Sequence, residues 1–277
     1  MSKKSNFIKI SDSLLEKINY EDSYELIWIL NILKIGKAYY TTWGDTKFLT
    51  TPAILINAIK NVEVPSRKVQ QTLLNSLEQL NEKELISVKQ DKLTWQSTIE
   101  IDFNKLIKVS HFARNGEWFG IFVEELNILF GQPFKEIDNL AKAYFYLVSR
   151  FNMSNIESLV EHKGEITLYD FEQNDNFNFT FVSDTIDYMR CRKNHRIECE
   201  NNWIGKKQLS DTLKTLSDIG LIKCTTRSIA NGSNKGLITK RNFYYLPCIE
   251  EWKMEKVIDR YVARKNWIET NKHTPQS

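Results

Sequence analysis

The chain has 277 residues, 42% of them hydrophobic and 12% aromatic, so it can bury a substantial core in one or two domains. No run approaches the ~20 apolar residues of a membrane span. The first residues also lack the apolar segment of a signal peptide. We therefore expect a cytoplasmic protein that keeps its four cysteines reduced.

Basic charge is concentrated towards the C-terminal end of the chain. The net charge of the whole chain is only +3, but residues 201–248 hold eight Lys/Arg against two Asp. That segment is therefore +6 and the remainder is −3, a distribution typical of a surface that faces a polyanion. Within it, residues 225–241 combine two of the ten glycines with Asn, Ser and four basic side chains. This pattern predicts a flexible, cationic hairpin.

The N-terminal part of the chain predicts short helices followed by a hairpin. A lead-in at residues 7–18 precedes a helix at 21–34, and Thr51 with Pro52 begins a second helix at 51–61. A third helix starts at its N-cap Ser66 and carries leucines at i, i+4 and i+7, which form one apolar stripe. After "NEKE", Leu-Ile opens one strand and "LTWQSTIEI" forms another.

The same pattern returns with an offset of 136 residues. A lead-in at 121–132 precedes helices at 136–152 and 182–194. A third helix then runs from its N-cap at Gly205 to Gly220, where a left-handed C-cap fits, and the cationic hairpin follows. The coinciding apolar pairs are Leu73/Leu209, Leu77/Leu213, Leu80/Leu216, Leu85/Leu221 and Ile86/Ile222.

Helix, tight turn and two-stranded hairpin form the back half of a winged helix-turn-helix. We therefore predict a mainly α protein with small β-hairpins (α+β), made of two tandem winged helix-turn-helix domains plus a C-terminal helix. The apolar stripe of that last helix suits docking on the second wing or dimerisation; it consists of Met254, Val257, Ile258, Tyr261 and Val262. The predicted bounds are 1–105 for the first domain, 106–120 for a linker, 121–248 for the second domain with an insertion at 153–180, and 249–277 for the helix and tail.

The third helix of each copy is the expected recognition helix, because its N-terminal half reaches base edges in helix-turn-helix proteins. Lys and Arg suit phosphates or guanine, whereas Gln and Asn suit adenine. In the first copy the predicted DNA-binding residues are Arg67, Lys68, Gln70, Gln71, Asn75, Lys89 and Lys92. In the second copy they are Lys206, Lys207, Gln208, Ser210, Lys214, Arg227, Lys235, Lys240 and Arg241.

The two copies differ in charge. Residues 61–101 hold five Lys/Arg against six Asp/Glu, a net charge of −1. Because neutralisation of phosphates dominates affinity for nucleic acids, the first copy should bind DNA more weakly or serve a partner protein or a dimer. For each single lysine a solvated helix face is the alternative, most of all for Lys214, which lies late in its helix.

Other chemistry has little support in the sequence. Cys191, His195 and Cys199 lie at i, i+4 and i+8, where they could share a helix face as zinc ligands. The short Cys-to-Cys spacing of structural zinc sites is missing, however, and the nearest fourth candidate is Cys224. The chain has neither a P-loop nor a G-x-S-x-G motif, and its four histidines are scattered. We predict no enzymatic activity, no metal and no cofactor.

Three segments carry a resemblance to a known family: "FIKISDSLLEK", "DNLAKAYFYLVSRFN", and "IGKKQLSDTLKTLSDIGLIK" with its basic wing. They resemble the winged-helix domains of plasmid and phage replication initiators and of primosome-type replication proteins. The resemblance implies binding to repeated double-stranded DNA sites at an origin, recruitment of host replication proteins and no catalysis. The insertion at 153–180 and the near-neutral first wing depart from it. A transcriptional regulator on the same scaffold, and an inhibitor or assembly factor that binds protein, are the alternatives.

Overall fold

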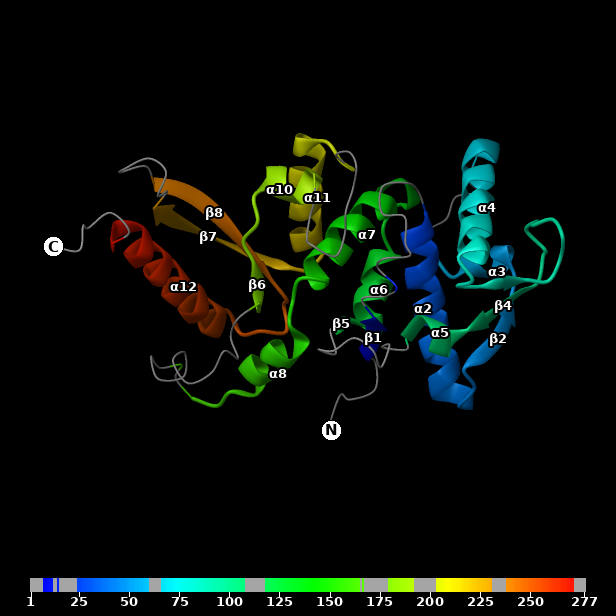
Figure 1. The fold of residues 1–277 in the computed structure, drawn as a ribbon, viewed down its shortest axis with the longest axis horizontal. Coiled ribbons are helices and arrows are strands. Elements are labelled where there is room, and N and C mark those ends of the chain that lie inside the picture. Colours follow the sequence, from blue (N-terminus) through cyan, green and yellow to red (C-terminus); the bar gives the residue numbers. More distant parts are fainter. Residues whose placement is uncertain are drawn as a thin grey trace. The chain divides into compact units, whose positions relative to one another are not determined.

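A computed structural model describes residues 7–11, 14, 24–59, 66–107, 118–164, 166, 179–191, 203–230 and 238–271, and the structural statements below concern these residues. The fold is mixed α+β, with helices and small antiparallel sheets (Figure 1). The chain divides into two compact units, Met1–Ser149 with Met189–Thr215 and Arg150–Tyr188 with Leu216–Ser277. The predicted α+β class is confirmed.

In its described residues, the first predicted repeat contains three helices and a three-stranded sheet. The sheet has the order β2 (Lys47–Thr50), β4 (Ile99–Asp102) and β3 (Ser87–Val88). Strand β2, which precedes α3 and α4 in the chain, therefore forms one edge, and the hairpin of β3 and β4 forms the rest of the sheet. Thr51 caps α3 by accepting a hydrogen bond from Ile54 N, and Ser66 caps α4 by accepting one from Val69 N, as predicted. The elements are α2 (Glu25–Trp43), β2 (Lys47–Thr50), α3 (Pro52–Asn57), α4 (Arg67–Glu82), β3 (Ser87–Val88) and β4 (Ile99–Asp102).

Helix α2 extends beyond the predicted end at residue 34 and continues through Gly36. A Cβ atom at Gly36 would lie 2.5 Å from Cδ2 of Phe103, which begins α5 (Phe103–Ile107) and is itself buried. Gly36 therefore serves a close approach of α5 to α2. The helix ends at Gly44, whose φ of 74° is the left-handed conformation that glycine adopts at helix C-termini.

The second predicted repeat has the same element order, with an insertion. Its three-stranded sheet has the order β6 (Phe181–Val182), β8 (Ile238–Tyr245) and β7 (Lys223–Ala230). As in the first sheet, the last strand of the repeat lies in the middle. The division between the two compact units falls within α11, after Thr215. The elements are α7 (Phe134–Val148), α8 (Met153–Glu161), β6 (Phe181–Val182), α10 (Ile186–Cys191), α11 (Lys206–Asp218), β7 (Lys223–Ala230) and β8 (Ile238–Tyr245).

The turns after α4 and α11 correspond in detail. Gly220 has a φ of 77°, which confirms the predicted left-handed cap, and Glu84, 136 positions earlier, has a φ of 59°. Leu85 N donates to Leu80 O over 3.0 Å, and Leu221 N donates to Leu216 O over 2.9 Å at the same offset. The ten apolar residues paired in the sequence are all buried. The offset of 136 therefore relates backbone conformation and packing as well as sequence.

The insertion at 153–180 starts with a helix. Asn152 caps α8 by accepting a hydrogen bond from Asn155 N, and its own N–H donates to Phe179 O, so the two ends of the insertion lie together. Helix α8 buries Met153, Ile156 and Leu159. Within the insertion, the segment "GEITLYDF" (164–171) predicts a strand, and it falls almost wholly outside the described residues.

The lead-ins of the two repeats pair with each other inside the first unit. Strand β1 (Phe7–Ser11) is antiparallel to β5 (Trp118–Phe122), which continues into α6 (Val123–Leu129). Helices α2 and α7 are also in contact, and Tyr24 stacks on Phe134 with ring centroids 5.7 Å apart. The predicted linker at 106–120 therefore includes the start of a paired strand, and the compact units differ from the predicted domains. Strand pairing over so long a sequence separation is not visible in local patterns.

The C-terminal helix α12 (Glu251–Asn271) packs on the second hairpin, within the second unit (Figure 1). Met254, Val257 and Ile258 of its predicted stripe are buried. The ring of Tyr261 contacts the ring of Phe243 on β8, with centroids 6.0 Å apart. Packing on the second hairpin is one of the two roles that the apolar stripe left open, and dimerisation stays a prediction.

Candidate nucleic-acid interface

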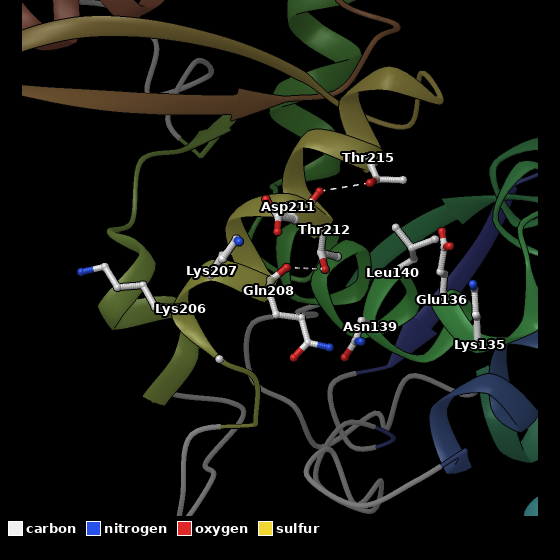
Figure 2. Close-up of a pocket in the computed structure, with 11 residues that line it drawn as sticks. Lys135, Glu136, Asn139, Leu140, Lys206, Lys207, Gln208, Asp211, Thr212 and Thr215 are labelled. Atoms are coloured by element: carbon white, nitrogen blue, oxygen red, sulfur yellow. Dashed lines mark hydrogen bonds between the residues drawn. The ribbon is translucent and has the colours of Figure 1, made fainter.

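The exposed side of α11 borders a groove in the first unit whose lining residues are mostly of polar types. The groove has a volume of about 720 Å³ and lies between the N-terminal part of α7 and α11. Figure 2 shows the side chains of Gln208 and Asn139 facing each other across it, whereas Lys206 points away. Its lining residues are Lys135, Glu136, Asn139, Leu140, Gly205, Lys206, Lys207, Gln208, Asp211, Thr212 and Thr215.

The groove offers hydrogen-bonding groups of both polarities. Gln208 and Asn139 carry primary amides, which both donate and accept and which suit an adenine edge. The hydroxyl of Thr212 donates to Gln208 O over 2.7 Å, so its lone pairs stay available to a donor. Glu136 and Asp211 add carboxylates, which accept from amino groups of bases but repel phosphate. This mixture can hydrogen-bond to both donors and acceptors of a ligand, and the lysines among the lining residues suit an anion.

Side-chain contacts to the backbone hold the start of α11 in place. Trp203 Nε1 donates to Met189 O over 2.9 Å, and Arg190 Nε donates to Ile204 O over 3.1 Å. Ile204 is itself buried. These bonds tie the end of α10 to the two residues before Gly205 and so fix where the helix begins. The five predicted positions of this helix are all exposed: Lys206, Lys207, Gln208, Ser210 and Lys214.

The first copy also presents most of its predicted residues to solvent. Gln71 Nε2 donates to Asn75 Oδ1 over 2.7 Å, so these two amides are held together on the exposed face of α4. Lys89 is paired with Glu100 of β4 over 2.6 Å, and this contact lowers the pKa of the Glu100 carboxyl. The exposed predicted positions are Arg67, Lys68, Gln71, Asn75, Lys89 and Lys92, while Gln70 is half-buried.

In the second hairpin, Arg227 forms ion pairs with carboxylates of the same chain. Its Nε lies 2.6 Å from Asp259 Oδ1 and its second guanidinium nitrogen lies 3.5 Å from Glu255 Oε1, both on α12. A third guanidinium nitrogen donates to Thr225 Oγ1 over 2.7 Å. Arg227 was predicted to lie along phosphates, but its charge is already paired with α12. These ion pairs could not be predicted from local sequence, because the partners lie 28 or more residues away in a separate helix.

The other predicted hairpin cations lie on different faces. The strand register pairs Arg241 with Arg227 and Lys240 with Ser228. Directly paired residues share one face of a sheet, and successive residues alternate between faces. Arg241 therefore shares the face of Arg227 and is half-buried, while Lys240 is exposed on the opposite face. Lys235, the remaining predicted cation, lies outside the described residues.

The zinc candidates fall mainly outside the described part of the chain. His195 and Cys199 are not described, and Cys191 ends α10. Cys224, the fourth candidate, is an exposed free thiol on β7.

Sequence reasoning missed three residues that lie beside predicted positions, two in the first unit and one in the second. Lys135 and Asn139 of α7 line the groove beside α11, and Asp259 of α12 holds Arg227. The periodicity of α7 indicates its polar side, but no local sequence pattern indicates that this side lies next to α11. The acidic spacing of Glu251, Glu255 and Asp259 at i, i+4 and i+8 was a signal for a helix face that meets cations.

Comparisons with protein-family models, with curated proteins and with solved structures found no match to this chain. Among the residues that the structure describes, no helix combines the length and apolar character that crossing a membrane requires.

Proposed function

We propose that the chain is a tandem winged-helix protein that binds double-stranded DNA in a sequence-specific way through α11 and the hairpin that follows it. Within this proposal it serves as a replication initiator of a plasmid, phage or other mobile element, binding origin repeats and recruiting replication proteins. The initiator role is the one implied by the resemblance of the three quoted segments.

One observation carries the proposal: the two repeats have the same element order and the same strand order. Each places an amphipathic helix directly before a hairpin, and the exposed side of that helix carries Arg, Lys, Gln and Asn in α4 and Lys and Gln in α11. These are the side chains that contact phosphates and base edges. The net charge of +6 on residues 201–248 supports the second repeat as the stronger binder.

The decisive experiment is selection of bound sequences from random duplex DNA by the full chain. Enrichment of a motif is expected, and its half-site spacing and orientation follow from the same data. Directly repeated sites favour an initiator, and inverted sites favour a transcriptional regulator on the same scaffold. Lack of enrichment together with lack of duplex binding would contradict DNA recognition and favour a protein-binding role.

The recognition helix is tested with a charge-matched pair of double variants. Lys206→Ala with Lys207→Ala is expected to weaken binding to the enriched duplex by about tenfold or more, since contacts to phosphates and bases are both lost. The control is Lys105→Ala with Lys163→Ala, which removes the same charge from two exposed positions on α5 and just after α8. Equal loss in both double variants would overturn the assignment of α11.

A further inference from the structure

We propose that the second hairpin contacts the DNA backbone with its outer face, the face opposite α12, and that Arg227 clamps α12 to the hairpin instead of binding phosphate. The outer face consists of Cys224, Thr226, Ser228, Ala230, Ile238, Lys240, Asn242 and Tyr244. This inference rests on the proposed duplex binding and adds which side of the wing the DNA meets.

The strand register and α12 together assign the two faces. The pairs Arg227/Arg241 and Thr225/Phe243 lie on the α12 side, since Arg227 is paired with Asp259 and Phe243 contacts Tyr261. The α12 side is also closed near the hairpin tip, where Ala230 N donates to Asn266 Oδ1 of α12 over 2.8 Å. The residues between these pairs point the other way and form the outer face.

The outer face and the α12 side of the hairpin differ in the acidic groups that border them. None of the eight outer-face residues is acidic, and Lys240 is a cation exposed there. The α12 side is bordered by the carboxylates of Glu255 and Asp259, whose side chains are 47% and 60% exposed. A phosphate backbone on that side would meet two negative charges and would have to displace them from Arg227. On the outer face it meets none.

The outer face also offers neutral groups that contact phosphates. The hydroxyl of Thr226 lies 2.9 Å from Asn242 Oδ1, and Asn242 Nδ2 donates to the hydroxyl of Tyr244 over 3.2 Å. Thr226, Ser228 and Asn242 are exposed, while Tyr244 is buried at the base of the hairpin. Hydroxyl and amide side chains of this kind make a large share of the contacts to phosphate oxygens in protein–DNA complexes.

Adjacent positions on opposite faces provide a matched test. Ser228→Glu adds a negative charge to the outer face, and Thr239→Glu adds the same charge to the α12 face, one residue along the partner strand. Both positions are exposed. The affinity of each full-length variant for a labelled mixed-sequence duplex is measured at several salt concentrations. Ser228→Gln and Thr239→Gln serve as neutral controls, and thermal melting checks that each variant is folded.

We expect Ser228→Glu to weaken binding by about tenfold and Thr239→Glu by less than about twofold, because only the first charge faces phosphate. In the same assay Lys240→Ala should lower the salt dependence of log K by about one phosphate contact, and Arg227→Ala should leave it unchanged. Equal losses in the two Glu variants, or a lower salt slope for Arg227→Ala, would overturn the face assignment while duplex binding stands. Failure of the wild-type chain to bind any duplex would overturn both proposals.

Discussion

At the scale of single residues, the left-handed turns after α4 and α11 show two different residue types, Glu84 and Gly220, in the same backbone conformation. Glycine adopts a positive φ without steric cost, whereas a residue with a Cβ atom loses about 1 kcal/mol in that region. Gly220 therefore matches its turn and Glu84 does not. The same hydrogen bond, from the residue after the turn back to the helix, is kept in both copies.

The two turns predict opposite responses to substitution. Gly220→Ala should lower the free energy of unfolding by about 1 kcal/mol or more, because alanine is strained at this φ. Glu84→Gly should leave stability unchanged or raise it by about 0.5 kcal/mol, since the relief of strain is offset by a more flexible unfolded chain. Urea denaturation of both variants measures the difference. Destabilisation of the same size in both would show that the turns are not equivalent.

Gly36 predicts a steric effect that runs against helix propensity. An exposed helical Gly→Ala change normally stabilises by about 1 kcal/mol, but a Cβ atom at this position lies 2.5 Å from the ring of buried Phe103. Gly36→Ala should therefore destabilise the protein by about 1–3 kcal/mol, as overpacking does. Adding Phe103→Leu removes part of the ring and should recover some of that loss. Thermal and urea denaturation of the single and double variants provide the measurement.

At the scale of elements, α12 is held to the second hairpin by an apolar stripe and by the Arg227 contacts. Ile258 is fully buried, so Ile258→Ala should lower the free energy of unfolding by about 2–4 kcal/mol. The control is Arg260→Ala on the exposed side of the same helix, which should change stability by less than about 0.5 kcal/mol. Similar effects of both substitutions in urea denaturation would show that the stripe is not what anchors the helix.

The elements were the most predictable part of the molecule. Periodic leucines, the caps Thr51, Ser66 and Gly220, and the α12 stripe all involve residues close in sequence, so local patterns identify them. The extension of α2 beyond residue 34 was not predicted, and the ring of Phe103 that packs against Gly36 is distant in the sequence. The candidate interface was predictable as a set of exposed residues on α4 and α11. The contributions of α7 and α12 required tertiary packing, which periodicity does not encode.

At the scale of the whole molecule, the two repeats are joined by their lead-ins inside the first unit. A fragment of residues 1–105 would lose β5, the partner of β1, and α7, which packs on α2. We expect it to lack a cooperative thermal transition, because the completely buried side of α2 would be exposed to water. A fragment of residues 1–149 restores both partners and should melt cooperatively. Thermal melting of the two fragments is followed by circular dichroism. Equally cooperative melting of both would show that β5 and α7 are not needed to stabilise the first repeat.

The pairing of β1 with β5 also has a consequence for the order of folding during synthesis. Strand β1 leaves the ribosome before its partner Trp118–Phe122, which is translated only after α2, α3, α4 and the first hairpin. Until then β1 presents unpaired backbone groups. The nascent chain thus carries an open strand edge while its first repeat forms, and a binding partner or chaperone that recognises extended segments has access to it only during that interval.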